Sequence, residues 1–338
     1  MQSLSVIYRP TEWEDCLGQS SIIKILKQQL LNKKYSNCYL FTGPSGVGKT
    51  TLARILANKI NNNVGSAIEI DGASNNGVDQ VRAIIEDAKE RSLVSPYKIY
   101  VIDECHAITS QGWQAFLKCL EEPPAHTIFI FCTTNIEKVP ETIQNRCMRF
   151  NFNRVSISEI ENKLKDICLN EGIKPDTESL NYISKLANGS VREAIATLEK
   201  CLDYNMDLNI NNVLECLGNF SHKTLFKLTN AIIDNDEKNI LLTTNEIFKN
   251  SSSLVRFVDY YFTFILDLSK YCLFKNTEII NIPSCYKEDL DYTTSIEDGS
   301  KYFTWLANKL LDLKLLLKQD TTGRDTLDLS LINMSRGN

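Results

Sequence analysis

Residues 43–50 read Gly-Pro-Ser-Gly-Val-Gly-Lys-Thr, a complete G-x-x-x-x-G-K-[ST] phosphate-binding loop. An apolar run typical of a buried strand precedes this loop at 38–42 (CYLFT). Apolar residues at helical spacing follow it over 52–60. At ordinary residue frequencies the bare pattern would arise in such a chain on the order of one time in a hundred, and the flanking strand and helix make a chance match rarer still.

Each residue type in the loop has a physical task. Gly43, Gly46 and Gly48 let the backbone curl so that its N–H groups point at phosphate oxygens. Lys49 can reach the β and γ phosphates, and the Thr50 hydroxyl can ligate magnesium. The loop therefore predicts that the chain binds ATP together with Mg²⁺, with the positive end of the following helix dipole facing the phosphates.

The first 150 residues alternate between strand-like and helix-like patterns. Strands are expected at 38–42, 67–71, 98–102, 127–132 and 147–152. Helices are expected at 21–32, 49–60, 78–92 and 110–121. This alternation predicts a mostly parallel sheet with helices on both faces and with ligands at the carboxyl ends of the strands.

Strand patterns stop near residue 154. Helices are expected at 156–170, 176–187 and 190–204, the last opened by a capping box, Ser190-Val-Arg-Glu193. A polar, Asn-rich stretch at 205–212 suggests a linker, and helical patterning resumes beyond it. The expected domains are a P-loop ATPase domain at 1–153, a small helical lid at 154–208 and an all-α domain at 213–338.

Composition places the chain among ordinary globular proteins, with 43% hydrophobic and 23% charged residues. The net charge of −5 excludes a global basic field, so any contact with DNA needs a local basic patch. The N-terminus lacks the plan of a signal peptide, and Asp267 and Lys270 interrupt the most apolar stretch, 260–274. We therefore expect a cytoplasmic protein that has no membrane partner.

The eleven cysteines contain no C-x-x-C pair. Most lie in apolar surroundings and are expected to be reduced core thiols, namely Cys38, Cys132, Cys168, Cys201, Cys216 and Cys272. Because no ligand pairs stand at the spacing of a zinc site, no zinc is expected.

A second chemical signal is the acidic pair Asp103-Glu104, which directly follows an apolar strand at 99–102. Asp103 is expected to join Thr50 as a ligand of Mg²⁺, and Glu104 to polarise the water that attacks the γ-phosphorus. An acidic pair after a strand is, taken alone, more often the start of a solvated loop. Its place behind an intact phosphate loop favours catalysis and indicates an ATPase.

Three further residues are candidates for the site. Thr134 ends the strand at 129–134, where it could sense the γ-phosphate or simply cap the strand. Arg146 precedes the next strand and could stabilise charge on a neighbouring subunit's triphosphate, with a surface salt bridge as the alternative. Arg192 lies in the first turn of a helix, where a cation opposes the helix dipole, and a nucleotide phosphate would explain it.

Longer segments carry a resemblance to one family. They are YRP (8–10) with GQ (18–19), GPSGVGKTT (43–51), IEIDGASNNGVDQVR (68–82), VIDECHAITSQGWQAFLKCLEEPP (101–124), TTNIEKVPETIQNRC (133–147) and NGSVREAI (188–195). In these segments the chain resembles the bacterial DNA polymerase III gamma/tau subunits, clamp loaders of the AAA+ class. The stretch 310–332 is similar to their last collar helices.

The resemblance implies an α/β P-loop AAA+ domain, a helical lid and an all-α collar. It implies that Tyr8, Arg9 and Pro10 border the adenine pocket. The phosphates would be held by the loop residues Gly43, Pro44, Ser45, Gly46, Val47, Gly48, Lys49, Thr50 and Thr51.

The resemblance also implies roles for the remaining candidates. Asp103 and Glu104 would form the second nucleotide motif. Thr134 would be the first sensor of the γ-phosphate and Arg192 the second. Arg146 would be the arginine finger that acts on ATP held by a neighbouring subunit.

The implied function is that of an ATP-hydrolysing subunit, not the nucleotidyl-transfer subunit, within a DNA polymerase III-type holoenzyme. Its partners would be other clamp-loader subunits in a pentameric hetero-oligomer, a sliding clamp that it opens, and primer-template DNA, which segment 74–82 could face. Two alternatives stay open: a non-hydrolysing scaffold subunit of the same loader, against which the intact Lys49 and Asp103 argue, and another AAA+ DNA motor.

Three departures from the family pattern are visible. Only five residues, 61–65 (NNNVG), stand where the family usually has a cysteine-rich zinc module. Asn145 precedes Arg146 where serine is usual. The sequence ends at Asn338 without a long tau extension, which suggests a minimal, gamma-like form.

Overall fold

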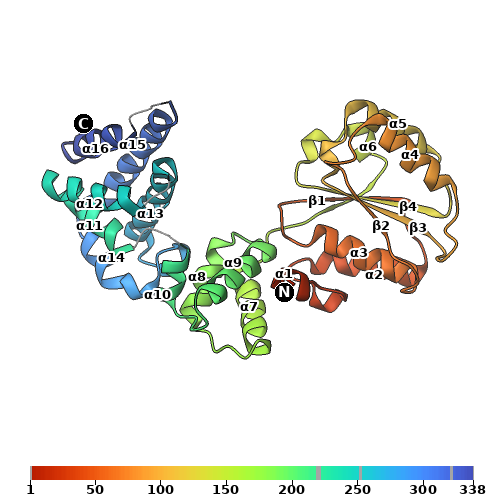
Figure 1. Cartoon of the computed structure of the whole chain (residues 1–338), viewed down its shortest axis with the longest axis horizontal. Helices are drawn as coiled ribbons and strands as arrows, with labels where there is room; N and C mark the ends of the chain where they lie inside the picture. Colours follow the sequence, from red (N-terminus) through yellow and green to blue (C-terminus); the bar gives the residue numbers. More distant parts are fainter. Residues whose placement is uncertain (1, 218–221, 251–252, 320–322, 338) are drawn as a thin grey trace. The chain divides into compact units, whose positions relative to one another are not determined.

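The computed structural model describes residues 2–217, 222–250, 253–319 and 323–337 (Figure 1). The chain forms two compact units. The sheet unit comprises Met1–Glu171 with Ile183–Glu199, and the helical unit comprises Gly172–Tyr182 with Lys200–Asn338. These bounds differ from the division at 1–153, 154–208 and 213–338, which stays a prediction.

The sheet unit alternates helices and strands as expected from the sequence. In chain order its elements are α1 (Leu4–Ile7), α2 (Ser20–Asn32), β1 (Cys38–Thr42), α3 (Lys49–Ile60), β2 (Ile68–Asp71), α4 (Val78–Lys89), β3 (Lys98–Asp103), α5 (Ser110–Glu121), β4 (Thr127–Thr133), α6 (Glu141–Gln144), β5 (Met148–Asn151) and α7 (Ile157–Asn170). Helices α8 (Thr177–Leu186) and α9 (Val191–Tyr204) continue the chain.

The five strands form one parallel sheet in the order β2-β3-β4-β1-β5, which confirms the predicted fold class. The register places Thr42 at the end of β1 beside Thr133 of β4 and Asn151 of β5. It likewise places Asp71 of β2 beside Asp103 of β3. The chain therefore leaves all five strands at one edge of the sheet, where the loops that follow can meet.

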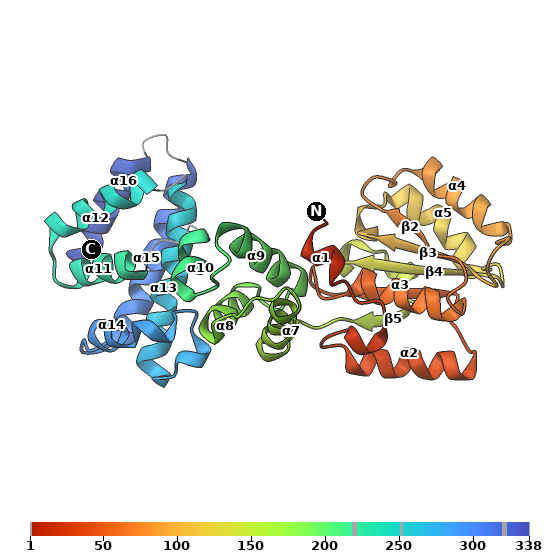
Figure 2. The ribbon, with the colours of Figure 1, turned by 60° about the horizontal axis from the view of Figure 1, so that its bottom comes forward.

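Helices cover both faces of the sheet because alternate strand residues point to opposite sides. Tyr39 and Phe41 of β1 enter a core with α2 and α3, whereas Cys38 and Leu40 enter a second core with α4 and α5. Figures 1 and 2 show these two pairs of helices on opposite faces of the sheet. Two apolar layers thus hold β1 in place.

The main local differences from the sequence prediction have hydrogen-bonding causes. The stretch 205–212 is not a linker, because Asn209 caps α10 by accepting from the N–H of Asn212. Leu208 beside it is buried, and its carbonyl oxygen accepts from Asp176 N–H at 3.1 Å. Asparagine side chains favour such caps and turns, so a polar composition alone does not predict a free segment. The complete capping box that Ser156 and Glu159 form at the start of α7 was not predicted from the sequence.

The helical unit confirms the expected all-helical C-terminal region. Its helices are α10 (Ile210–Cys216), α11 (His222–Ile233), α12 (Glu237–Asn250), α13 (Leu254–Phe274), α14 (Lys287–Thr293), α15 (Gly299–Gln319) and α16 (Gly323–Ser335). Residues 320–322 of the collar-like stretch 310–332 lie outside the described residues. Over the described ranges, none of the helices has the length and apolarity that a membrane span needs.

The apolar stretch 260–274 lies inside α13, and the two charged residues that interrupt it form an ion pair with each other. Asp267 is buried, pairs with Lys270 at 2.9 Å and accepts from the backbone N–H of Asn281 at 2.8 Å. A buried carboxylate needs such partners, because an unpaired charge in an apolar interior costs several kcal/mol.

One buried group in the helical unit lacks this compensation. His222 is only 3% exposed and stands among the rings of Tyr260, Phe264 and Tyr286. Its Nδ1 has no hydrogen-bond partner among the described residues. Burial lowers the pKa of His222 from 6.5 to about 4.

Between about pH 6.5 and pH 4, His222 is therefore protonated in the unfolded chain and neutral in the folded chain. Stability contributed by the neutral imidazole is full above pH 6.5 and is lost as the pH falls through this window. We expect the free energy of unfolding of the helical unit to drop by about 2 kcal/mol from pH 7.5 to pH 5. Hydrogen exchange of the α13 amides at the two pH values, corrected for the pH dependence of the intrinsic exchange rates, measures this drop in free energy. In His222→Phe this drop should largely vanish, and an equal drop in both proteins would contradict the assignment.

Candidate functional site

A pocket of about 970 Å³, its open mouth included, lies at the carboxyl edge of the sheet. Among the residues named from the sequence, its lining contains Tyr8, Arg9, Pro10, Ser45, Gly46, Val47, Gly48, Lys49, Thr50, Thr51, Asp103, Glu104 and Arg192. Sequence reasoning missed further lining residues, among them Cys16, Phe152, Lys163 and Ile195. Ile195 ends the segment NGSVREAI, whereas Cys16, Phe152 and Lys163 carry no motif, so only the fold identifies these three.

The phosphate loop begins where β1 ends and closes at the N-terminus of α3. Two of its glycines have no room for a side chain. A Cβ on Gly43 would lie 2.4 Å from the carbonyl oxygen of Phe152, and one on Gly46 would lie 2.0 Å from Ser190 Oγ. The Gly46 carbonyl oxygen also accepts from the N–H of Val191 at 3.0 Å. The loop thus packs directly against the start of α9, which brings Arg192 to the pocket.

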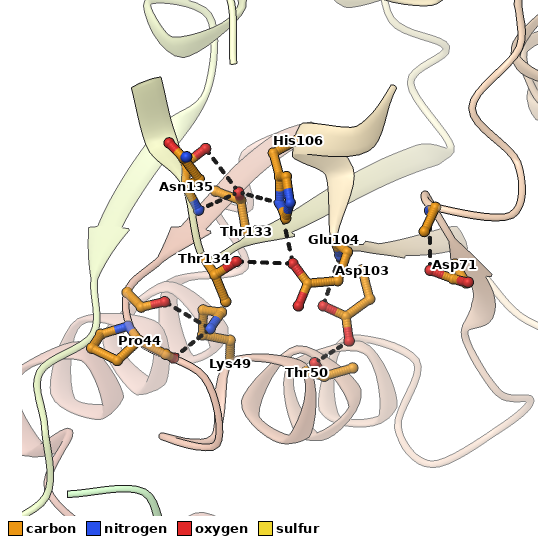
Figure 3. Close-up of polar contacts among 12 residues, drawn as sticks. Pro44, Lys49, Thr50, Asp71, Asp103, Glu104, His106, Thr133, Thr134 and Asn135 are labelled. Carbon is orange, nitrogen blue, oxygen red and sulfur yellow. Dashed lines mark hydrogen bonds and ion pairs between the residues drawn. The ribbon is translucent and has the colours of Figure 1, made fainter. Parts of the chain in front are cut away.

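Lys49 lies inside the loop and is 6% exposed. Its Nζ donates to the carbonyl oxygens of Gly43 at 2.8 Å and Pro44 at 2.6 Å (Figure 3). Burial lowers the pKa of Lys49, while the carboxylates of Asp103 and Glu104 act in the opposite direction. The loop therefore holds an ammonium group with its own carbonyls, in the position from which it can meet phosphate oxygens.

The two residues expected to hold magnesium touch each other. Thr50 Oγ1 donates to Asp103 Oδ2 at 2.7 Å, and Asp103 Oδ1 accepts from the N–H of Glu104 at 3.0 Å. Hydroxyl and carboxylate oxygens are ligands that Mg²⁺ accepts, and in nucleotide sites the substrate phosphates supply others. This donor set fits Mg²⁺. Among the described residues, no group of three or more His, Cys, Asp or Glu could hold a metal ion.

Glu104 and Thr134 also meet across the sheet edge (Figure 3). Thr134 Oγ1 donates to Glu104 Oε2 at 3.1 Å. The sequence left open that Thr134 caps the end of its strand. That cap is made by Thr133, whose Oγ1 accepts from the N–H of Asn135 at 3.0 Å. The hydroxyl of Thr134 is thus directed at the acidic residue, and its role as a sensor stays a prediction.

The N-terminal segment contributes cationic and aromatic groups to the pocket. Burial lowers the pKa of Arg9, and repulsion from Arg54 and Arg192 lowers it further. Such mutual repulsion among guanidinium groups fits an anionic ligand of high charge. Tyr8 donates its hydroxyl to Glu171 Oε1 at 2.6 Å, and this contact raises the pKa of Tyr8.

Arg146 does not line the pocket of its own chain. Its Nη1 donates to the carbonyl oxygen of Thr142 at 2.7 Å, and its Nη2 pairs with Glu121 Oε1 at 2.6 Å. About a third of the side chain, 34%, remains exposed. The surface salt bridge considered from the sequence is therefore present, and action on a neighbour's triphosphate stays a prediction.

Comparisons with known proteins find similarity to subunits of DNA polymerase III. The family model described as DNA polymerase III, delta subunit, matches residues 66–156. The DNA polymerase III subunit tau of Bacillus subtilis is 35% identical over 286 residues, 77% of this chain and 51% of that protein. The gamma subunit of Buchnera aphidicola subsp. Schizaphis graminum is 35% identical over 270 residues, 73% of this chain and 74% of that protein. The chain therefore spans about half the length of the Bacillus relative.

A solved structure matches the fold alone. The Holliday junction branch migration motor RuvB of Thermotoga maritima is 20% identical and aligns with a TM-score of 0.54. The alignment covers 67% of this chain and 79% of RuvB. At this identity the likeness shows a shared fold and carries no argument about function.

The contact between Gly46 and α9 can be tested by adding one methyl group. Gly46→Ala meets both a left-handed φ of 72° and the Ser190 hydroxyl. Gly172→Ala has the same φ of 72° with nothing within 4 Å, so it controls for the general cost of a left-handed alanine, about 1 kcal/mol, at a position outside the pocket. We expect nucleotide affinity, measured by calorimetry, to fall by about tenfold or more only in Gly46→Ala. Equal affinity of both variants would contradict this packing argument.

Proposed function

The chain belongs to the DNA polymerase III gamma/tau family, and we propose that it is an ATP-hydrolysing clamp-loader subunit. It would work in the cytoplasm within a pentameric hetero-oligomer, open a sliding clamp and place it on primer-template DNA. The observation that carries this proposal is the convergence at one sheet edge of Lys49, the Thr50–Asp103 contact and the Thr134–Glu104 contact. These are the parts that phosphoryl transfer to water requires.

The geometry supports a division of labour in the pocket. The loop N–H groups, Lys49 and Arg192 would bind the phosphates of ATP, and Tyr8 and Pro10 would border the base. Thr50 and Asp103 would hold Mg²⁺, which supplies neutralisation of phosphate charge when bound. Glu104 would accept the proton of the attacking water, because its carboxylate stands at the same edge.

A non-hydrolysing scaffold subunit is the weaker alternative. Such a subunit has no need for a base and a hydroxyl directed at each other, yet Glu104 and Thr134 are hydrogen-bonded at 3.1 Å. Lys49 is likewise intact and buried in the loop. The surroundings of Glu104 therefore favour hydrolysis.

Phosphate release with and without the cognate clamp and primed DNA tests the proposal. We expect low turnover by the assembled subunits alone and at least about tenfold stimulation when both the ring and the primed template are present, because ligands that select the active state shift its population. Lys49→Ala should abolish the signal and so exclude a contaminating ATPase. Turnover that ignores the ring, or depends on DNA alone, would count against a clamp loader.

The role of Arg146 has a matched set of variants. Arg146→Ala in the assembled complex should leave ATP affinity nearly unchanged and reduce turnover about a thousandfold, as removal of an arginine finger does. Arg149→Ala removes a nearby arginine that contacts Gln144 and Asn151 instead. Glu121→Gln breaks the same intrachain ion pair and keeps the arginine. Both controls should retain turnover within about threefold, and normal turnover by Arg146→Ala would remove the finger assignment.

A further inference from the structure

His106 contacts Glu104, and the proposed ATPase mechanism gives this contact no role. It lies in a short 3₁₀ turn, Cys105–Ala107, directly after Glu104. Its Nδ1 is 3.1 Å from Glu104 Oε2 and 3.2 Å from Thr133 Oγ1 (Figure 3). The imidazole side chain is 21% exposed, so it is largely enclosed at the sheet edge.

The neighbours of Nδ1 determine where the imidazole proton sits. The ionised carboxylate of Glu104 can only accept hydrogen bonds. The hydroxyl of Thr133 donates its hydrogen to the carbonyl oxygen of Asn135 at 3.1 Å, so it too faces His106 as an acceptor. Two acceptors around one ring nitrogen require that this nitrogen be protonated. Nδ1 therefore carries a hydrogen, which faces Thr133 Oγ1 at 3.2 Å, and the same nitrogen lies within ion-pair distance, 3.1 Å, of Glu104 Oε2.

Two side chains from different elements reach the same oxygen of Glu104. Thr134, just beyond β4, and His106, in the turn after β3, both contact Oε2. Fixing one carboxylate oxygen twice fixes the rotation of the group, and it leaves Oε1 as the oxygen that can accept a proton from water. Glu104 itself has a left-handed φ of 45°, a conformation that costs energy unless its surroundings hold it.

The Thr133 contact ties this arrangement to the phosphate loop. Thr133 stands beside Thr42 in the sheet register, and its carbonyl oxygen accepts from the N–H of Gly43 at 3.3 Å. The imidazole thus bridges the acidic residue to the strand that anchors the first glycine of the loop.

We propose that His106 is a positioning residue that, together with Thr134, orients the Glu104 carboxylate for proton abstraction from water. The inference rests on the proposed ATPase function and adds a specific requirement to it. The requirement is a hydrogen-bond donor at the δ position of residue 106. The charge of the imidazole is not needed, since a neutral ring with the proton on Nδ1 makes the same contact.

A pair of substitutions separates the donor from the bulk of the side chain. His106→Asn keeps an N–H donor at the δ position, and His106→Leu removes it at similar size. In the assembled complex we expect His106→Leu to lower kcat about tenfold to a hundredfold, with the KM for ATP and the nucleotide Kd unchanged. His106→Asn should stay within about threefold of the wild type. A side chain needed only for folding would not show this split between kcat and KM.

A double-mutant cycle supplies the second readout. If His106 acts through Glu104, then in a Glu104→Gln background the change His106→Leu should have no further effect on kcat. Independent losses that multiply would overturn the inference, as would wild-type kcat in His106→Leu or an equal loss in both His106 variants. Should His106→Leu fail to bind nucleotide, the inference is likewise overturned, because positioning of Glu104 does not require the residue for binding. An inactive wild-type complex would instead refute the proposed function.

Discussion

The parallel register of the five strands is the constraint on which the site depends. Because β1 lies between β4 and β5, the loop after Thr42 starts beside Thr133 and Asn151. The same edge receives Asp103 at the end of β3. Residues that are far apart in the chain therefore meet at one edge, and cores on both faces hold the strands that carry them.

The packing of α9 against the phosphate loop extends this arrangement beyond the sheet. The N–H of Val191 reaches the carbonyl oxygen of Gly46, and the missing Cβ of that glycine leaves the space for Ser190. Arg192 and Arg9 then face the pocket together with the buried ammonium of Lys49. The pocket lining contains four cationic and three acidic side chains, so it is slightly positive although the whole chain carries a net charge of −5.

Local motifs made much of this predictable from the sequence, and contacts between distant segments account for what was missed. The strand at 38–42 and the helix at 49–60 have the predicted bounds, because the loop between them fixes both. Lys49 and Asp103 follow from short motifs and do line one pocket. The link from His106 to Thr133 joins residues 27 positions apart, and no periodicity predicts it. The Arg146–Glu121 pair, 25 positions apart, is of the same kind.

The ion pair of Arg146 affects how two subunits would approach each other. A guanidinium beside a carboxylate presents a dipole to its surroundings, and the field of a dipole decays faster with distance than that of a free charge. Arg146 therefore exerts little attraction across the solvent, and its charge becomes available only once another anion stands close enough to compete with Glu121. If Arg146 acts on a neighbouring protomer, encounter would depend on other surfaces, and this arginine would contribute only after docking.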